Sequence, residues 1–231
     1  MEVYVKVISK LPKWAWVGAS ALTFSAGLIN AVAFLGFTHG AVTHVTGEIS
    51  GLSIALSKAD WLVSRHLLSV VLAFFFGSMV CGVIVRDSHL KIGRRYGGAL
   101  ILESFLLCAS VAGFKSNSIN GEILASLACG LQNAMASTYS GAIIRTTHMT
   151  GIVTDLGSLI GQWISGMEFD YRKACLYLLL LISFLTGGCI GVFIFKIINY
   201  FALLLPAIIT GFAGFLYILL RWVKLSRSEL C

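Results

Sequence analysis

Long apolar runs separated by short polar segments dominate the pattern of the chain. Six runs are long enough to be interpreted as membrane-spanning helices, at residues 14–37, 62–85, 98–114, 123–144, 174–197 and 200–222. A helix needs about 20 apolar residues to cross the hydrocarbon core of a bilayer. The runs are continuous and lack the alternation of roughly ten-residue barrel strands, so a membrane β-barrel is excluded. The pattern predicts an all-α integral membrane protein.

Two further segments, at 40–57 and 145–164, are shorter and richer in Thr, Gly and His, and each carries an acidic residue. The distribution of positive charge decides whether they cross the membrane. Basic residues cluster in three places: Lys6, Lys10 and Lys13; Arg86, Lys91, Arg94 and Arg95; and Arg221, Lys224 and Arg227. Basic residues mark the cytoplasmic side of membrane proteins. All three clusters share that side only if both short segments enter and leave by one face, which predicts six spans, two re-entrant or broken helices and cytoplasmic termini.

An internal repeat supports this count. The segment AGLINA at 26–31 corresponds to CGLQNA at 129–134, and THVTG at 43–47 corresponds to THMTG at 147–151. A looser match joins 81–84 to 190–194, at an offset of about 109. Repeat one then covers about 14–114 and repeat two about 121–222, within a single membrane domain of residues 1–231. Each unit holds three crossings, an odd number, so the sequence predicts inverted three-span repeats, the plan of many secondary transporters.

Composition agrees with a lipid environment and excludes several classes of function. The chain is 58% hydrophobic and only 12% charged, about half the charge of an ordinary soluble domain. The net charge of +7 comes from residues at the ends of apolar runs, so we expect no nucleic-acid partner. The first apolar run is too long for a cleavable signal peptide, and we interpret it as a retained span. Five of the six cysteines lie inside apolar segments, with no CxxC spacing, and are interpreted as small hydrophobic residues.

The two THxTG motifs are the most informative candidate chemistry. Thr46 and Thr150 are predicted to cap short helices, with Gly47 and Gly151 letting the backbone turn. These helices, at about 47–57 and 151–164, would reach roughly halfway through a bilayer. Inverted symmetry would bring their starts together near the midplane, where unpaired N–H groups and the helix dipole attract an anion or a carboxylate.

Several polar residues around these motifs complete the predicted substrate site. Besides the helix starts at Thr46–Gly47 and Thr150–Gly151, the predicted site includes the first threonine and the histidine of each motif and polar or acidic residues near the motifs: Asn30, Thr43, His44, Glu48, Gln132, Asn133, Thr147, His148 and Asp155. Ionisable residues at such a depth are functional candidates, and histidine changes charge between about pH 5 and 8, which could couple transport to protons. The alternative is a neutral histidine that hydrogen-bonds a threonine or a carbonyl and plugs a broken helix.

Other roles for these polar residues also stay open. Asn30 and Asn133 either line a polar site or join helices, and Gln132 beside Asn133 favours a cavity. Glu48 and Asp155 are predicted in the first turns of the short helices, where an acid complements the dipole. Glu48 is also a candidate proton or cation site.

Three more features bear on function. Arg145 either binds an anion or marks the cytoplasmic edge of the second short segment, and the second interpretation is favoured. Glu103, near the start of its run, is expected to pair with Arg94 or Arg95 near the membrane surface. Glycine pairs spaced by four, such as Gly157 and Gly161, indicate close helix contacts within the chain or in a homodimer.

The segments AGLINAVAFL, THVTGEIS, GLQNAMAS and RTTHMTGIVTDLG resemble the YoaK-like family of bacterial membrane proteins (DUF1275, UPF0700), over about residues 21–197. The second half matches the family pattern through Gln132, Asn133, Thr146, Thr147, Thr150, Gly151 and Asp155. The first half departs from it, because Asn30 stands where the family has Asp and Glu48 where it has Asn. The resemblance implies a multi-pass protein of the bacterial inner membrane, and the family has no settled activity.

The sequence thus favours a small secondary transporter or channel for a small solute, an anion or carboxylate, with lipid and that solute as its partners. The alternative is a non-transporting membrane scaffold or regulatory subunit. No HExxH, GxSxG or P-loop occurs, so we expect neither an enzyme nor a cofactor or metal site. A lipid-acting enzyme ranks last, because its only candidate acids, Glu48, Glu103 and Asp155, are predicted at unrelated depths.

Overall fold

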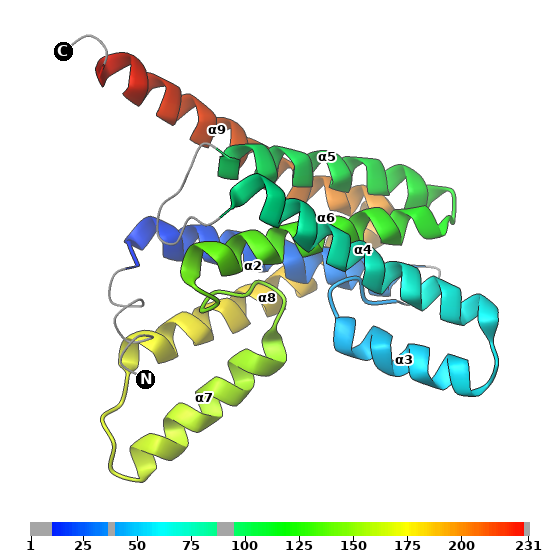
Figure 1. The fold of residues 1–231 in the computed structure, drawn as a ribbon, viewed down its shortest axis with the longest axis horizontal. Coiled ribbons are helices and arrows are strands. Elements are labelled where there is room, and N and C mark those ends of the chain that lie inside the picture. The colour runs from blue at the N-terminus through cyan, green and yellow to red at the C-terminus, as the bar shows by residue number, and fades with distance from the viewer. Residues whose placement is uncertain (1–10, 37–39, 87–94, 229–231) are drawn as a thin grey trace.

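The computed structural model describes residues 11–36, 40–86 and 95–228, and every regular element in these ranges is helical (Figure 1). The elements are α2 (Lys13–Phe34), α3 (Val45–Ser57), α4 (Trp61–Val85), α5 (Arg95–Lys115), α6 (Ile119–Ser140), α7 (Met149–Ile164), α8 (Tyr171–Ile198), the short 3-10 helix η1 (Asn199–Leu203) and α9 (Leu204–Ser228). Each predicted run corresponds to one long helix and each short segment to one short helix. The predicted all-α class is confirmed.

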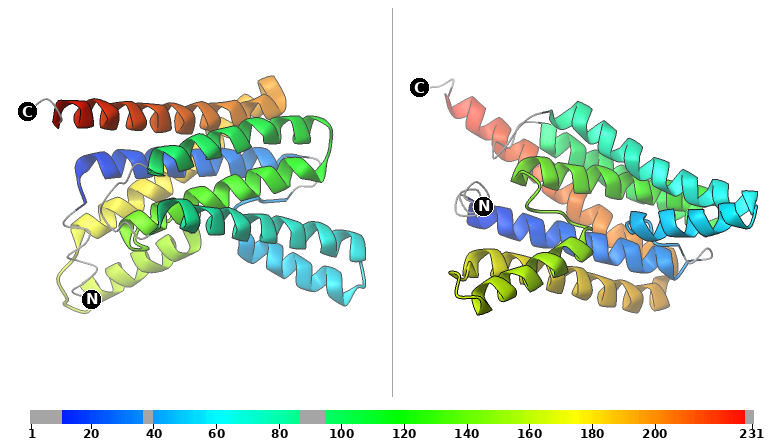
Figure 2. Two further views of the ribbon diagram at one scale, coloured as in Figure 1. Left: turned by 45° about the horizontal axis from the view of Figure 1, so that its top comes forward. Right: turned by 60° about the horizontal axis from the view of Figure 1, so that its bottom comes forward.

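Within the described residues, four helical stretches are apolar and long enough to cross a membrane: α2, α4, α5 and Tyr171–Leu220. The last stretch has 50 residues, which as one straight helix would extend about 75 Å, more than twice the hydrocarbon core of a bilayer. It is divided at η1, where the chain reverses from α8 into α9 (Figure 2). α6 carries Glu122, Gln132 and Asn133 and is not among the four stretches.

The long helices run in alternating directions along one axis. α2, α5 and α8 begin at one end of the bundle, and α4, α6 and α9 end there (Figures 1 and 2). Lys13, Arg86 and Arg95 therefore lie at this end, as the charge pattern predicts. Lys6, Lys10, Lys91 and Arg94 lie outside the described residues, as do the side chains of the cluster at the end of α9.

Two of the helix crossings depend on glycine. Where α2 meets α8, a Cβ on Gly27 would collide with the backbone carbonyl of Phe184, and one on Gly187 with the carbonyl of Phe24. The backbones touch here because neither glycine has a side chain, which is the usual device for close helix packing in membranes.

The crossing of α4 and α6 is built in the same way. A Cβ on Gly130 would collide with the carbonyl of Phe74, and one on Gly77 with the carbonyl of Leu127. Gly130 stands 103 positions after Gly27, and Gly187 stands 110 positions after Gly77. The looser sequence match of 81–84 with 190–194 has an offset of about 109. It is therefore one residue out of register with the offset of 110 between Gly77 and Gly187 at these contacts.

The helices that follow the two short segments also begin alike. α4 is capped by Asp60, whose side chain accepts a hydrogen bond from the backbone N–H of Val63 at 3.2 Å. α8 is capped by Asp170, which accepts one from the N–H of Lys173 at 2.9 Å. Aspartate is among the preferred N-cap residues because it satisfies an otherwise unpaired N–H group.

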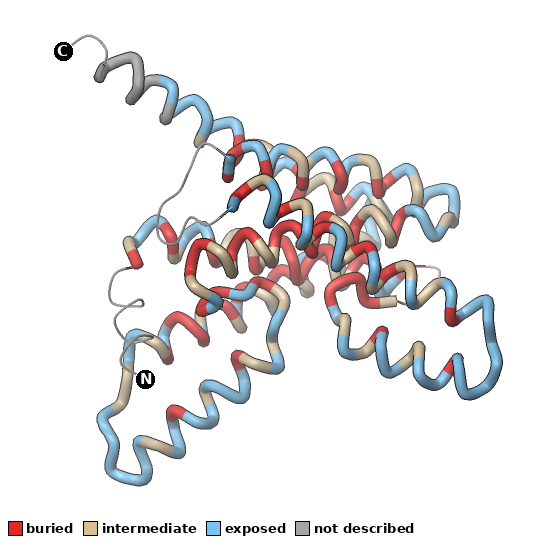
Figure 3. The backbone as a smooth tube through the Cα atoms, viewed as in Figure 1, coloured by how far each residue is buried: buried red, intermediate tan, exposed pale blue. Residues whose placement is uncertain are grey.

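The two short helices, α3 and α7, have 13 and 16 residues, or about 20 and 24 Å. They begin near the middle of the bundle and run towards opposite ends (Figure 1). Both are mostly exposed, whereas buried residues gather where the long helices cross (Figure 3). A Cβ on Gly157 or Gly161 would meet nothing within 4 Å in the described chain, and the homodimer that this glycine face suggests stays a prediction.

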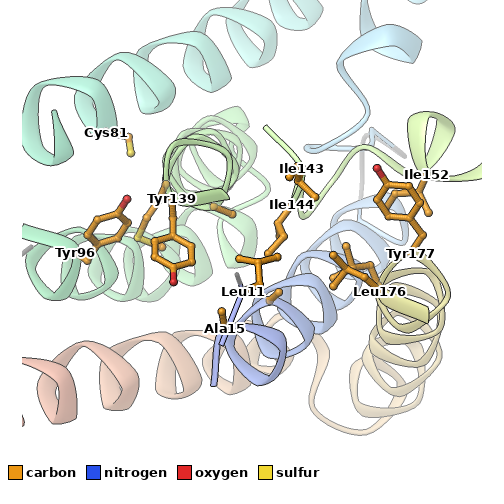
Figure 4. Packing of buried hydrophobic residues seen from close by; sticks show 14 of the residues in the cluster. Leu11, Ala15, Cys81, Tyr96, Tyr139, Ile143, Ile144, Ile152, Leu176 and Tyr177 are labelled. Carbon is orange, nitrogen blue, oxygen red and sulfur yellow. The ribbon is translucent and has the colours of Figure 1, made fainter. Parts of the chain in front are cut away.

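The described part of the chain contains two core clusters of buried apolar residues. One of them, seen in Figure 4, joins Leu11 and Ala15 near the N-terminal end of α2 to Leu176 and Tyr177 on α8, with Ile152 of α7 beside them. Glu103 on α5 is fully buried, and neither of its carboxylate oxygens has a hydrogen-bond partner among the described residues. Its expected pairing with Arg95 is therefore wrong, and Arg94 lies outside the described residues.

Candidate functional site

The short helices begin at the histidines of the THxTG motifs. His44 is the N-cap of α3, with φ −98° and ψ 59°, and His148 is the N-cap of α7, with φ −93° and ψ 62°. The carbonyl of His44 accepts a hydrogen bond from the N–H of Glu48 at 3.1 Å. The prediction that Thr46 and Thr150 cap these helices is wrong, because both lie inside the first turn.

Glycine at the third residue after each cap makes room for the imidazole ring. A Cβ on Gly47 would lie 2.6 Å from Nδ1 of His44, and one on Gly151 would collide with Nδ1 of His148. Both glycines lie within regular helix. Their role is therefore to seat the ring over the first turn, and the backbone turn predicted from the sequence occurs before them.

A cavity of about 240 Å³, which we call the central cavity, lies between the two helix starts. It is lined by Thr43, His44, Val45, Thr46, Phe74, Asn133, Ser137, Arg145, Thr147, His148 and Thr150. Residues of the two motifs, about a hundred positions apart in the chain, thus line one space.

The lining of the central cavity is rich in hydrogen-bond donors. It offers the guanidinium of Arg145, two imidazoles, the amide of Asn133 and several hydroxyls, and no carboxylate is among its lining residues. The positive ends of the α3 and α7 dipoles also meet here. Such a set of groups stabilises negative charge.

A second cavity, of about 370 Å³, lies between α7 and α8, and we call it the side cavity. It shares Arg145 and His148 with the central cavity and adds Asp155, Lys173 and Tyr177. The prediction that Asp155 lies in the first turn of its helix is wrong, because α7 begins at Met149 and has no acid there. Asp155 instead lines the side cavity together with two cationic side chains.

Arg145 is exposed and lines both cavities. Its Nη1 lies 3.3 Å from Nδ1 of His148. The role of a membrane-edge marker, favoured from the sequence, does not account for this position. The sequence signal that could have placed Arg145 in the site is its position two residues before the second THxTG motif.

Asn30 and Asn133 hold matching sequence positions but differ in their contacts. Oδ1 of Asn30 accepts hydrogen bonds from the backbone N–H and the hydroxyl of Thr43, at 3.2 and 2.8 Å. Asn133 lines the central cavity, and its Oδ1 is buried without a hydrogen-bond partner in the described chain. The first asparagine thus fixes a motif, and the second presents an unpaired amide oxygen.

Two other predicted site residues hold the structure near the cavity. The amide of Gln132 donates a hydrogen bond to the carbonyl of Leu22, which joins α6 to α2. Glu48 is buried and accepts a hydrogen bond from the N–H of Ala41 at 3.1 Å. Neither side chain is among the lining residues of the two cavities.

The structure therefore divides the predicted site. Seven of its residues line the central cavity: Thr43, His44, Thr46, Asn133, Thr147, His148 and Thr150. Gly151 and Asp155 line the side cavity. Asn30, Gly47, Glu48 and Gln132 lie outside both. The sequence reasoning did not identify Ser137, Lys173 and Tyr177, which only the folded chain brings to the cavities.

Comparison with known proteins gives a family but no activity. A family model described as "Protein of unknown function (DUF1275)" matches residues 18–216. The UPF0700 transmembrane protein YoaK of Bacillus subtilis (strain 168) is 26% identical over 149 residues, which cover 59% of this chain and 63% of that protein. The match thus spans less than two thirds of the relative's length. No solved structure matches the chain.

Proposed function

The chain belongs to the DUF1275 family of proteins of unknown function, and from this premise we propose that it is a small secondary transporter or channel for a small anion or carboxylate. The observation that carries the proposal is the central cavity. Residues of both THxTG motifs and Arg145 line it, and no carboxylate is among its lining residues. The two short helices direct their N-terminal ends at one space, and an anion there would meet unpaired N–H groups, imidazoles and a guanidinium.

The proposal includes an architecture of six spans and two re-entrant helices in inverted three-span repeats. It is supported by the opposite directions of α2 and α6 and by the matching glycine crossings at Gly27–Phe184 and Gly130–Phe74. In this arrangement the N-terminal end of α2, the end of α4, the start of α5 and the end of α9 lie on one side. The basic clusters assign that side to the cytoplasm, and the membrane is then the bacterial inner membrane.

Transport would follow from movement of one unit against the other around the cavity, as in other inverted-repeat transporters. α3 packs on α4 and α7 packs on α8, so each short helix would move with the long helix that follows it. The cavity would then open alternately towards the two ends of the bundle.

The non-transporting scaffold remains the alternative. It predicts helix starts that pack shut against each other, whereas a cavity of about 240 Å³ separates them here. This cavity favours the transporter. No enzymatic activity is part of the proposal.

The test is ligand binding followed by flux. We would measure the thermal stability of the purified full chain with formate, acetate, succinate, phosphate, sulfate and chloride, and with sodium, potassium and ammonium as the cation series, at about pH 5.5 and about pH 7.5. A ligand at 100 times its dissociation constant that binds only the folded state stabilises it by about 2.7 kcal/mol. We expect a selective anion, whose counterflow into proteoliposomes is then measured.

The test variant is the double variant Thr46→Val, Thr150→Val, which keeps the shape of both helix starts and removes two lining hydroxyls. We expect it to lose much of the stabilisation and of the counterflow. If every anion leaves the wild-type stability unchanged at both pH values, the transporter proposal fails and the scaffold alternative takes its place.

A further inference from the structure

Three ionisable side chains, one each on α3, α4 and α6, form a cluster. Nε2 of His66 on α4 lies 2.9 Å from Oε2 of Glu122 on α6. The side chain of Glu122 is 1% exposed and that of His66 is 13% exposed. Glu48 on α3 is also buried and interacts electrostatically with both. We call these residues the Glu48–His66–Glu122 cluster.

The other half of the molecule shows that packing alone does not require these charges. Glu48 follows Gly47 as Ile152 follows Gly151, and His66 lies six residues after Asp60 as Leu176 lies six after Asp170. Glu122 precedes Gly130 by eight residues, as Ala19 precedes Gly27. Ile152, Leu176 and Ala19 all belong to the apolar cluster of which Figure 4 shows a part. The side chains between α7 and the bundle are thus apolar, whereas those at the matching positions beside α3 are ionisable.

The charges of the cluster do not balance without an additional proton. A protonated His66 beside two ionised carboxylates leaves one net negative charge, and a buried unpaired charge is costly. One more proton makes the cluster neutral. Two carboxylates that share one cation take up this proton as a unit, so that it belongs to the cluster and not to either acid.

Other charged groups around the cluster do not supply the missing positive charge. On α3, the exposed His44 at the cap also interacts with Glu48. On α4, Arg65 beside His66 is exposed and is not among the groups that interact with Glu48 or His66 in the described chain. On α5, Glu103 interacts electrostatically with Cys81 and Cys129, which lie further along α4 and α6 than His66 and Glu122.

The side chain of Glu48 connects the cluster to the rim of the central cavity through a hydrogen bond. Oε1 of Glu48 accepts from the N–H of Ala41, two residues before Thr43 and three before His44, which line the cavity. A proton on Glu48 weakens this charged acceptor and loosens the turn that holds both lining residues. Proton occupancy can therefore change the shape of one rim of the cavity.

We propose that Glu48, His66 and Glu122 form one proton-binding site that sets the state of the central cavity, on the side of α3 away from the basic segments. Its coupling to transport rests on the proposed function, whereas the binding of the proton does not. α3 runs from the cavity towards the end of the bundle opposite Lys13, Arg86 and Arg95 (Figure 1). The proton therefore enters from that end, through the partly exposed His66.

The experiment is infrared difference spectroscopy of the full chain in proteoliposomes, with stepwise changes of pH and detection of the protonated-carboxyl band. The variants are Glu48→Gln, Glu122→Gln and His66→Gln, with Glu168→Gln as the control, since Glu168 is exposed in the α7–α8 connection. We expect the wild type and the control to gain the band as pH falls. Either cluster glutamine variant should lose it, since one carboxylate and His66 already balance. His66→Gln should gain it at higher pH than the wild type.

Absence of a titrating band in the wild type would overturn the proposal, as would its persistence in both cluster glutamine variants. The anion panel is repeated on Glu48→Gln. If the band behaves as expected and no anion stabilises any form of the protein, the proton site stands and the transport proposal fails. If an anion binds with the same pH dependence in the wild type and in Glu48→Gln, the link between cluster and cavity is refuted.

Discussion

The guanidinium of Arg145 lies 3.3 Å from Nδ1 of His148 at the start of α7. Arginine is only a donor, so in this contact Nδ1 of His148 is the acceptor. The matching position in the first half is Val42 or Ala41, which has no charge. The two histidines are therefore not equivalent, and positive charge is concentrated on the α7 side of the central cavity.

Replacing Arg145 by glutamine should weaken anion binding. One hydrogen bond to a charged group contributes about 1.5–3 kcal/mol, which corresponds to a roughly 10- to 150-fold higher Kd. Isothermal titration calorimetry with the anion selected in the stability panel measures this change. Arg65→Gln is the control, because Arg65 is exposed on α4 and lines neither cavity. Equal losses in the two variants would mean that the anion responds to overall charge and does not contact Arg145.

The glycines of the two motifs give a second prediction. Alanine at Gly47 or Gly151 should displace the imidazole of the preceding cap and lower anion affinity. Stability without ligand should stay within about 1 kcal/mol, because alanine is the better helix former and a ring can rotate away. Gly157→Ala is the control on α7, where a Cβ meets open space. Thermal melts with and without the anion separate the two effects, and an equal affinity loss in Gly157→Ala would contradict the proposed ring displacement.

The helices of this fold were predictable from the sequence because lipid leaves the backbone few choices. A chain in hydrocarbon must satisfy its N–H and C=O groups internally, so each long apolar run becomes a helix. The start of α3 was not predictable in the same way. Thr46 is a better general N-cap than His44, but the space above Gly47 lets the histidine ring lie over the first turn.

The candidate site was only partly predictable because identical residues acquired different partners. Asn30 and Asn133 match in sequence, yet among the described residues only Asn30 accepts a hydrogen bond from a threonine of its own motif. The contact between His66 and Glu122 joins residues 56 positions apart on two helices. Hydrophobic periodicity does not specify such a contact, which depends on how α4 crosses α6.

The glycines of α2 give a third prediction, in which the same substitution changes the stability of the protein in opposite directions at two positions. Gly18→Ala on α2 should stabilise the protein by up to about 1 kcal/mol, because its Cβ meets nothing within 4 Å and alanine favours the helix. Gly27→Ala should destabilise it by about 1–3 kcal/mol or more, because the obstacle is the backbone of Phe184. Thermal melts in one detergent compare them. A loss of stability in Gly18→Ala similar to that in Gly27→Ala would show that the crossing is not the cause.

The paired asparagines give the last prediction, in which stability and binding separate. Asn30→Ala removes the acceptor of two hydrogen bonds and leaves the N–H and hydroxyl of Thr43 without it. Thr43 is 6% exposed, and a buried group left unsatisfied costs about 1–3 kcal/mol. Asn133→Ala removes an amide whose oxygen has no partner in the described chain, so the unliganded melting temperature should hardly change, while anion affinity should fall because the N–H donors of this lining amide are lost.

Melts of both asparagine variants with and without the selected anion decide the matter. Asn30→Ala should melt lower in both conditions, and Asn133→Ala should differ from the wild type only when the anion is present. A large loss of unliganded stability in Asn133→Ala would mean that its amide has a structural role like that of Asn30. The central cavity would then lose its one unpaired amide as a ligand group, and recognition would rest on Arg145, the histidines and the hydroxyls.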